Sequence, residues 1–302
     1  MKIPIYFLGT SQAIPTAKRN HTAVLLQYKN ENILVDCGEG TQRQFRKAKL
    51  NPCALTRILI THWHGDHVLG LPGLLQTLAL NNYNKTLHIY GPRGTKRFMD
   101  LLYSLFVPRG KVKLQVQEIQ SGKFLETSDF ILEAYEMKHG TPTLAYSFIE
   151  KNKLRLDKSK LKKFNLPHSP LLGELQQGKS IKYKGKIIRA KDVAYKQSGK
   201  KITFILDTAI NSNCYKAAEQ ADLLISESTF LEDSENGKSL AKEYKHLTAK
   251  QAAEIAKKSK VKELFLTHIS QRYQANESKI LNEAKKLFKN TKLAEDLMKD
   301  EI

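Results

Sequence analysis

The feature that most constrains this chain is a cluster of potential metal ligands directly after a short apolar segment. The apolar run Arg57–Thr61 predicts a buried strand, and four ligand-type side chains follow it within six residues: His62, His64, Asp66 and His67. Imidazole nitrogens and carboxylate oxygens suit zinc and similar divalent ions. On a turn after a strand, the two histidines spaced by one residue can hold one ion, and the following Asp-His pair its neighbour. A solvated loop that happens to be rich in histidine does not explain four potential ligands separated by only two other residues.

Strand and helix patterns recur on both sides of this cluster and predict an α/β fold. The predicted strands cover Lys2–Leu8, His21–Tyr28, Asn32–Asp36, Arg57–Thr61, Leu87–Tyr90, Lys113–Ile119, Phe130–Lys138, Thr143–Glu150, Lys201–Leu206, Leu223–Ser226 and Glu263–Thr267. The predicted helices cover Thr41–Lys49, Pro72–Leu80, Thr95–Phe106, Asn213–Gln220, Thr248–Ser259 and Glu277–Phe288.

Three further potential ligands stand at the ends of predicted strands: His139, Asp207 and His268. Each alone would more often be an ordinary turn residue. A rigid sheet, however, aims the residues at its strand ends toward one edge. Because the cluster near residue 62 already indicates a metal site, their shared position favours all three as ligands.

These features together resemble a known enzyme family. The histidine-rich loop, the three later ligands and the opening segment Phe7-Leu8-Gly9-Thr10 are similar to the metallo-β-lactamase superfamily. Within it, the resemblance to the ribonuclease Z family of tRNA 3′-processing endoribonucleases covers nearly the whole chain. The segments that carry this finer resemblance are Asp36–Gln42 (DCGEGTQ), Thr61–His67 (THWHGDH), Leu69–Leu75 (LGLPGLL) and Thr267–Tyr273 (THISQRY).

The resemblance implies an α/β fold, the four-layer αββα metallo-β-lactamase sandwich, with two Zn²⁺ ions per subunit. Mn²⁺ or Fe²⁺ would also accept such ligands. Asp207 would bridge the two ions, and Asp66 would also accept a proton from the attacking water. The remaining metal ligands would be His62, His64 and His139 for one ion, and Asp66, His67 and His268 for the other.

The resemblance also implies a general acid. His246 matches the family position that protonates the leaving ribose oxygen, and Glu227 would orient its imidazole. Without the family, a turn residue before a helix would be the simpler reading of His246. The loop Pro15–Asn20 is similar to a family loop that approaches the RNA 3′ end, although its lysine, Lys18, falls one position later.

Positive charge is concentrated in one stretch of the chain. The 302 residues carry 50 Lys and Arg against 30 Asp and Glu, a formal net charge of +20, which favours a polyanionic partner. Residues 151–201 account for 16 of the basic and 3 of the acidic residues, a net +13, and apolar residues are sparse there. The composition alone predicts an insertion that contributes little core. The resemblance implies a single metallo-β-lactamase-like domain over 1–302 with a flexible tRNA-binding arm inserted at 151–195. Lysines there would bind phosphates largely without regard to base sequence.

Other properties bear on location and assembly. No apolar run reaches the roughly 18–20 residues that a membrane-spanning helix needs, so no membrane partner is expected. The three cysteines, Cys37, Cys53 and Cys214, are scattered and indicate a reducing compartment, which predicts a cytoplasmic protein. The family resemblance predicts a homodimer.

The leading hypothesis is a zinc-dependent endoribonuclease that removes the 3′ trailer from precursor tRNA. It would leave a 3′-hydroxyl on the tRNA and a 5′-phosphate on the trailer. Other enzymes of the same fold hydrolyse small phosphodiesters or could trim other RNA from the 3′ end; a thioesterase or lactamase has no need of a lysine-rich arm. A non-catalytic RNA-binding module with structural zinc is the remaining alternative, but closed structural sites do not expose a ligand such as Asp66 to solvent.

Overall fold

The computed structural model describes residues 2–105, 112–167 and 169–302. Within these residues the chain forms two compact units. The first contains the chain up to Leu125, residues 132–148 and the chain from Lys201 onward, and the second contains residues 126–131 and 149–200. The predicted end of one helix at Phe106 lies outside the described residues.

The first sheet belongs to the N-terminal half of the chain, apart from one strand. It has seven strands among the described residues and is mixed. The pairs β3–β4, β4–β5 and β5–β6, on one side of the sheet, are parallel, and the pairs on the other side are antiparallel. In spatial order the strands are β18 (Lys299–Glu301), β1 (Pro4–Gly9), β2 (Ala23–Tyr28), β3 (Glu31–Val35), β4 (Arg57–Leu59), β5 (Thr86–Gly91) and β6 (Lys113–Glu118).

The second sheet also has seven strands in the part of the chain that the structure describes. Its pairs β14–β15, β15–β16 and β16–β17 are parallel, so their carboxyl ends meet at one edge. Strands β14 to β16 are almost wholly buried, as expected for parallel strands covered on both faces. In spatial order the strands are β17 (Thr291–Leu293), β16 (Glu263–Thr267), β15 (Leu223–Glu227), β14 (Lys201–Ile205), β9 (Leu144–Glu150), β8 (Phe130–Glu136) and β7 (Gly122–Glu126).

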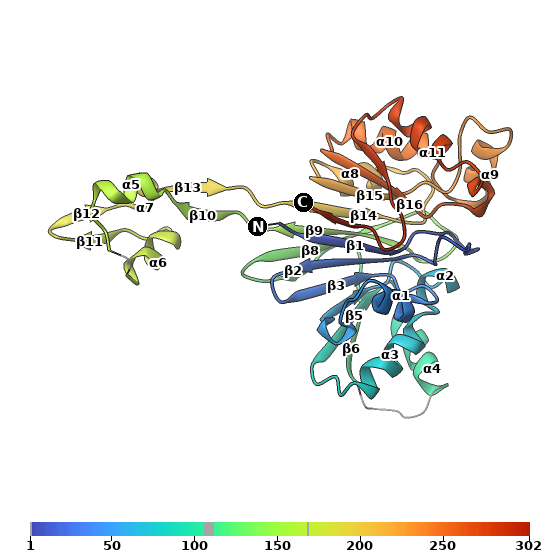
Figure 1. Ribbon diagram of the computed structural model, residues 1–302, viewed down its shortest axis with the longest axis horizontal. Coiled ribbons are helices and arrows are strands. Elements are labelled where there is room, and N and C mark those ends of the chain that lie inside the picture. Colours follow the sequence, from blue (N-terminus) through green and yellow to red (C-terminus); the bar gives the residue numbers. More distant parts are fainter. Residues whose placement is uncertain (1, 106–111, 168) are drawn as a thin grey trace. The chain divides into compact units, whose positions relative to one another are not determined.

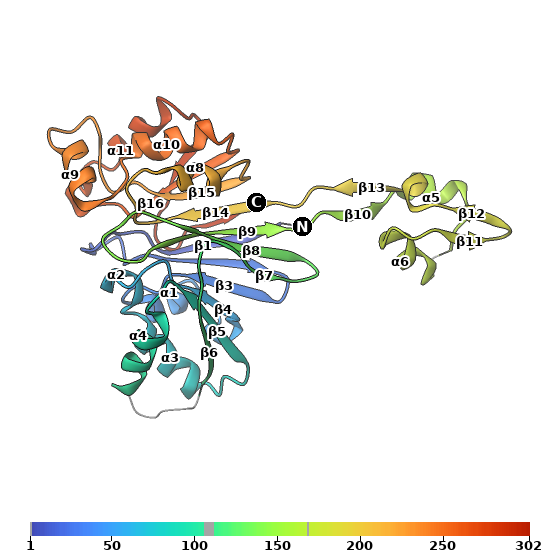
Figure 2. The ribbon, with the colours of Figure 1, turned by 180° about the vertical axis from the view of Figure 1, so that it is seen from behind.

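The two sheets face each other, and helices cover their outer faces (Figures 1 and 2). Aromatic pairs join the sheets: the ring centroids of Phe7 and Phe265 are 5.0 Å apart, and those of Tyr28 and Phe148 are 5.1 Å apart. The helices α1 (Thr41–Lys47), α3 (Leu71–Leu80) and α4 (Thr95–Ser104) cover the first sheet, and α8 (Ser212–Ala218), α10 (Ala249–Lys258) and α11 (Ser278–Lys285) cover the second. This arrangement confirms the predicted α/β sandwich.

Short elements complete the first unit. The helix α2 (Gly65–Val68) follows β4, and α9 (Gly237–Tyr244) precedes α10. The 3₁₀ turns are η1 (Pro52–Ala54) and η2 (Gln271–Tyr273). No helix in the described ranges is long and apolar enough to cross a membrane.

The second unit has a small hydrophobic core of its own. Leu175, Ile188 and Val193 are buried in it, although the sequence there is poor in apolar residues. Two antiparallel strand pairs and three short helices bring these few side chains together. These elements are β10 (Lys153–Leu156) with β13 (Ala194–Gln197), β11 (Ile181–Tyr183) with β12 (Lys186–Ile188), and the helices α5 (Lys158–Lys163), α6 (Leu171–Gln176) and α7 (Ala190–Val193).

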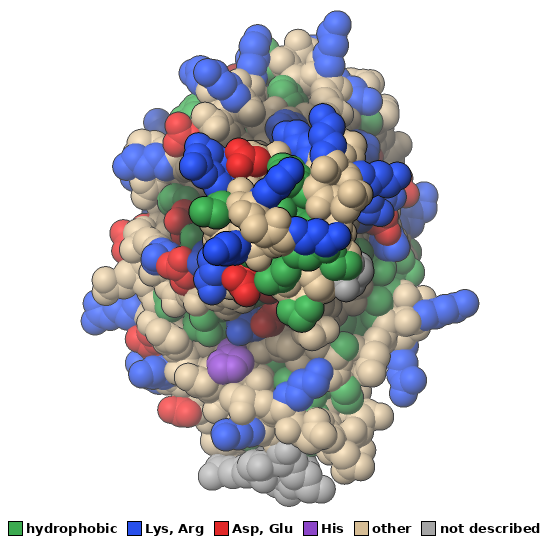
Figure 3. Space-filling model, turned by 90° about the vertical axis from the view of Figure 1, so that its left-hand side faces the viewer, with side chains coloured by type: hydrophobic (Ala, Val, Ile, Leu, Met, Phe, Trp, Pro, Cys, Tyr) green, Lys and Arg blue, Asp and Glu red, His purple; other side chains and the backbone are tan. Residues whose placement is uncertain are grey.

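Lysine side chains dominate the exterior of this unit. In α5, Lys160, Lys162 and Lys163 are exposed, and Asp157 caps the helix by accepting hydrogen bonds from the backbone of Ser159 and Lys160. Figure 3 shows lysine and arginine side chains spread over the face in view, with fewer acidic side chains among them. The unit therefore combines a folded core with a strongly cationic surface.

Candidate metal centre

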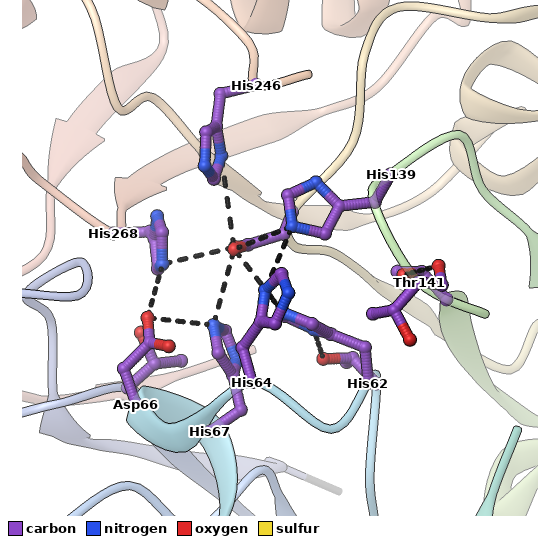
Figure 4. Close-up of polar contacts among 12 residues, drawn as sticks. His62, His64, Asp66, His67, His139, Thr141, His246 and His268 are labelled. Carbon is purple, nitrogen blue, oxygen red and sulfur yellow. Dashed lines mark hydrogen bonds and ion pairs between the residues drawn. The ribbon is translucent and has the colours of Figure 1, made fainter. Parts of the chain in front are cut away.

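The histidine-rich loop lies between β4 and α2. His62 and His64 are in extended backbone before the helix, and Asp66 and His67 occupy its first turn. His62 and His67 are fully buried and His64 is exposed. Asp66 is buried, so the expectation that it faces solvent is wrong, because the surrounding ligands and the packed segment beneath the loop cover it; it still lines the hollow over the site. The change from extended chain to helix brings all four side chains toward one centre, as the sequence predicted (Figure 4).

Glycines allow another segment to pack tightly beneath this loop. A Cβ atom at Gly38 would collide with the backbone carbonyl of Asp66, and one at Gly70 would collide with the carbonyl of Gly38. Backbone hydrogen bonds from Cys37 N to His67 O (2.8 Å) and from Gly70 N to Cys37 O (2.9 Å) hold the two segments together. The glycines of the DCGEG and LGLPG segments are therefore required by close backbone approach.

The remaining predicted residues come from strand ends and one turn. Asp207, Glu227 and His268 lie at the carboxyl ends of β14, β15 and β16, which are parallel neighbours. His139 follows β8, and His246 lies in the turn between α9 and α10. His268 has a positive φ of 59°, an unusual conformation for a non-glycine residue that is enriched at functional sites.

The first ligand group contains His62, His64, His139 and Asp207, whose ligand atoms all lie within 4.8 Å of one another. Nδ1 of His64 is 3.0 Å from Nε2 of His62 and 3.2 Å from Nε2 of His139. Oδ2 of Asp207 is 3.6 Å from Nε2 of His62 and 3.8 Å from Nε2 of His139.

The second ligand group contains Asp66, His67, His268 and, again, Asp207. Oδ2 of Asp66 is 3.3 Å from Nε2 of His67 and 3.4 Å from Nε2 of His268. Asp207 places Oδ1 3.1 Å from Nε2 of His268 and Oδ2 3.5 Å from Nε2 of His67. The structure thus brings all seven predicted ligands together, with Asp207 in both groups.

In four of the histidines, Nδ1 donates a hydrogen bond to an acceptor on the side of the ring away from the centre. The other nitrogen, Nε2, therefore carries the lone pair and faces the centre. Nδ1 of His67 is 2.6 Å from the Asp36 carboxylate, and Nδ1 of His139 is 3.1 Å from the Lys245 carbonyl. Both acceptors require the proton on Nδ1.

Two threonine hydroxyls fix the orientation and the protonated nitrogen of the other two rings, those of His62 and His268, in the same way. Thr61 Oγ1 donates to Asp36 (2.7 Å), so it accepts from Nδ1 of His62 (3.1 Å). Thr229 Oγ1 donates to Glu227 (2.6 Å), so it accepts from Nδ1 of His268 (2.9 Å).

These contacts fit a pair of bound divalent ions. Nε2 of His67 is buried and faces carboxylate oxygens of Asp66 and Asp207 at 3.3 and 3.5 Å, without the geometry of a hydrogen bond to any described residue. An imidazole that is held by its outer nitrogen and bare on its inner one is typical of a metal ligand. The nitrogen and carboxylate donors suit zinc and related metals.

Asp36 is one of the site residues that the sequence did not predict. It accepts hydrogen bonds from the Thr61 backbone (2.7 Å), the Thr61 hydroxyl and the His67 ring. In the sequence, Asp36 is an ordinary acidic residue at the end of a predicted strand. The segment Asp36–Gln42 contributes to the family resemblance, but nothing in it assigns a role to Asp36 itself. Its left-handed backbone, with φ of 57°, is a signal that only the structure supplies.

The predicted acid and its carboxylate form a pair beside the ligands. Nδ1 of His246 is 3.0 Å from Oε2 of Glu227 and 3.9 Å from Oδ2 of Asp207. Glu227 is fully buried and also accepts from the backbone of Thr208 (2.6 Å). Burial alone lowers the pKa of His246, but the carboxylates of Glu227 and Asp207 outweigh it and raise this pKa to about 9. The pairing leaves Nε2 of His246 for a substrate.

A hollow of about 340 Å³ opens over the ligands. It is lined by ligands from both groups and by His246, and its rim includes Ile14, Tyr244 and Arg272. These residues could hold two divalent ions with an open face beside the His246 imidazole, and ions held there would supply Lewis-acid chemistry suited to hydrolysis of a phosphate ester.

Known proteins share both the fold and the length of this chain. A family model described as Anti-Pycsar protein Apyc1 matches residues 3–153, a stretch that includes the histidine-rich loop and His139 but ends before Asp207. Ribonuclease Z of Methanosarcina acetivorans is 37% identical over 99% of this chain and 97% of its own length. Ribonuclease Z of Methanothermobacter thermautotrophicus is 38% identical over 99% of this chain and 96% of its own. The crystal structure of the short form of human tRNase Z has a TM-score of 0.71 and 29% identity, covering 98% of each chain.

The fold and the paired ligand groups define a metal-dependent hydrolase of the metallo-β-lactamase superfamily. The matches to the two ribonuclease Z proteins cover 99% of this chain, whereas the Apyc1 match ends at residue 153, so the family is assigned from the matches over nearly the whole chain. The chain belongs to the ribonuclease Z family of tRNA 3′-processing endoribonucleases.

Proposed function

We propose that this protein cuts precursor tRNA at its 3′ trailer with two Zn²⁺ ions, leaving a tRNA 3′-hydroxyl and a trailer 5′-phosphate. The observation that carries the proposal is the pair of ligand groups sharing Asp207 beside the Glu227–His246 pair, in a chain that matches ribonuclease Z over its full length. Mn²⁺ or Fe²⁺ would fit the same nitrogen and oxygen donors.

In this proposal the chain divides its ligands between two positions. His62, His64 and His139 would hold one ion, Asp66, His67 and His268 would hold the other, and Asp207 would be a ligand to both. Two such ions, when bound, lower the pKa of water and stabilise the charge that builds on the phosphate oxygens during in-line displacement.

Asp66 and His246 are the proposed proton carriers: Asp66 acts on the attacking water and His246 on the leaving oxygen. Asp66 has a carboxylate at the edge of the hollow and accepts a proton from the attacking water. His246 donates a proton from Nε2 to the departing ribose 3′ oxygen, because Glu227 engages Nδ1 and favours the protonated ring. Glu227 is a positioning residue in this scheme.

We also propose that residues 151–195 form a flexible, protruding arm that holds the tRNA. The net charge of +13 over residues 151–201 supports this role, because lysines bind phosphates without reading bases. From the family resemblance alone we also propose a homodimer, in which the arm of one subunit and the active site of the other would share one tRNA. A cytoplasmic location stays a prediction from the scattered cysteines.

The proposed activity is tested directly with a precursor tRNA that carries a 3′ trailer. Mapping the ends after incubation with the zinc-loaded protein should give a single cut that leaves a 3′-hydroxyl and a 5′-phosphate. Bis(p-nitrophenyl) phosphate, a small phosphodiester, serves as the comparison substrate. Turnover of the small ester without cleavage of the tRNA would instead support the alternative of a small-phosphodiester hydrolase.

Removing the arm should affect cleavage of precursor tRNA but not hydrolysis of the small phosphodiester. Lys153 pairs with Gln197 across the antiparallel β10–β13 ladder, so a short glycine linker can join Asn152 to Ser198. We expect this deletion to lower kcat/KM for precursor tRNA by about a hundredfold or more, since many phosphate contacts are lost. Hydrolysis of the small ester should be unchanged.

A charge variant provides the matched control for this deletion. Lys160→Glu with Lys163→Glu alters exposed side chains of α5 and leaves the core of the second unit in place. It should weaken tRNA binding and reduce the dependence of binding on salt. Equal loss of both activities in the two variants would contradict the role of the arm.

A further inference from the structure

An aromatic side chain stands open at the rim of the catalytic hollow. Tyr244 is the last residue of α9 and lines the hollow, yet 51% of its surface is exposed. A tyrosine ring presents a large apolar face, and such rings contribute most when something covers them. The uncovered ring therefore offers a stacking surface next to the ligand groups.

The ring of Tyr244 rests on a fixed support. Its centroid is 6.4 Å from that of Phe230, with an angle of 22° between the planes, and Phe230 is 5% exposed. Backbone hydrogen bonds from Phe230 N to Leu247 O (3.3 Å) and from Ala249 N to Phe230 O (2.9 Å) hold the lower ring in place. The ring of Tyr244 is therefore already positioned against Phe230 in the absence of substrate.

A cation lies against the same aromatic group. The guanidinium carbon of Arg272 is 5.7 Å from the centroid of the Phe230 ring. Arg272 is exposed and, among the residues that the structure describes, forms no ion pair. Stacking rings with an adjacent arginine are the side chains that hold single-stranded nucleotides in other binding grooves.

The chain links this stacking surface to the acid. Lys245 separates Tyr244 from His246 and has a left-handed backbone, with φ of 57°, which reverses the chain. A hydrogen bond from His246 N to Ala241 O (2.8 Å) closes the turn, and the rings of His246 and Phe230 are 6.1 Å apart. The stacking surface and the proposed acid are therefore joined through a single closed turn.

We propose that Tyr244 stacks on the base of the last nucleotide that stays on the tRNA, with Arg272 beside the same nucleotide. This inference rests on the proposed function, in which His246 protonates the 3′ oxygen of that nucleotide. The ribose must then lie at His246, and of the two phenyl-type rings that line the same hollow, Tyr244 is the exposed one. Stacking accepts all four bases, because each has a π face, and so suits an enzyme that must process many tRNAs.

The first test uses precursor tRNAs that lack one base beside the cut. On intact substrate, Tyr244→Ala should lower kcat/KM by about tenfold, roughly 1.4 kcal/mol, and Tyr244→Phe should retain most activity. On a substrate that is abasic at the last retained nucleotide, wild type and Tyr244→Ala should cut at similar rates. On a substrate abasic at the first trailer nucleotide, the tenfold difference should persist. A difference that persists on both abasic substrates, or that disappears only with the trailer base removed, would overturn the inference.

The second test does not need cleavage. The product tRNA is made with 2-aminopurine as its last nucleotide and is bound to the zinc-loaded enzyme. Stacking on Tyr244 should quench the fluorescence, Tyr244→Phe should keep the quenching, and Tyr244→Ala should lose most of it. Equal quenching by the wild type and Tyr244→Ala would overturn the inference. The two failures are distinguishable: absence of trailer cleavage by the wild type would contradict the proposed function, whereas the fluorescence experiment tests the stacking inference by itself.

Discussion

Replacing Asp207 by alanine is expected to remove both metal ions and nearly all activity. Asp207 belongs to both ligand groups, and its oxygens lie 3.1 to 3.8 Å from Nε2 of four histidines. If each ion contributes about 3 kcal/mol of transition-state stabilisation, loss of both lowers the rate by roughly ten-thousandfold. Because the ions act on the phosphate itself, precursor tRNA and the small p-nitrophenyl ester should be affected alike.

The measurement combines metal content with activity. Purified wild type should hold two ions per chain by elemental analysis, His62→Ala should lose metal and activity together, and Asp207→Ala should hold little metal. His88→Ala is the matched control, because His88 lies on β5 outside both ligand groups and should change neither quantity. A chelator should inactivate the wild type, and added Zn²⁺ should restore it. Full metal content in Asp207→Ala would contradict the bridging assignment.

The sequence predicted the residues of this centre because they are carried by strong local patterns. The run Glu263–Thr267 was predicted as a strand, and β16 has those bounds, with His268 following directly. The helix predicted from Thr248 begins there because Thr248 and Gln251 form a capping box. Where an apolar run ends in a histidine or an acidic residue, the sequence predicts both the strand and the metal ligand that follows it.

The missed elements lack such patterns. Strand β18, Lys299–Glu301, is short and charged, and it is held by backbone pairing with β1 at the sheet edge. Strand β7, Gly122–Glu126, is also at an edge and is mostly exposed. An edge strand needs neither apolar alternation nor burial to form its backbone hydrogen bonds, so its sequence carries little signal.

The missed site residues depend on contacts between distant segments. Asp36 acts through Thr61 and His67, which lie 25 and 31 residues further along the chain. Thr229 acts through His268, 39 residues away. Neither residue type is distinctive by itself, and only the folded sheet shows which imidazole each one orients. The sequence therefore predicts the groups that face the metals better than those that hold the groups in place.

Replacing His246 by alanine is expected to remove tRNA cleavage while leaving both metals bound. His246 lies outside the two groups of predicted ligands; it forms a third group of potential ligands with Glu227 and His268, but Glu227 already occupies its Nδ1. Loss of a general acid typically costs about 10²–10⁴-fold in rate. The loss should be large for precursor tRNA, whose ribose oxygen is a poor leaving group, and small for bis(p-nitrophenyl) phosphate, whose phenolate leaves without a proton.

The substrate dependence separates an acid from a structural residue. A residue that only supports the metal centre would affect both substrates, as Asp207→Ala should, whereas loss of the acid affects only the substrate that needs a proton. Glu227→Gln should show the same pattern more weakly, since the amide still contacts the ring but removes the negative charge that favours its protonation. Metal analysis accompanies each assay, because Glu227 also accepts from Thr229, which holds His268. Equal losses on both substrates with full metal content would rule out the acid role of His246 and leave only a role in binding or positioning the phosphate.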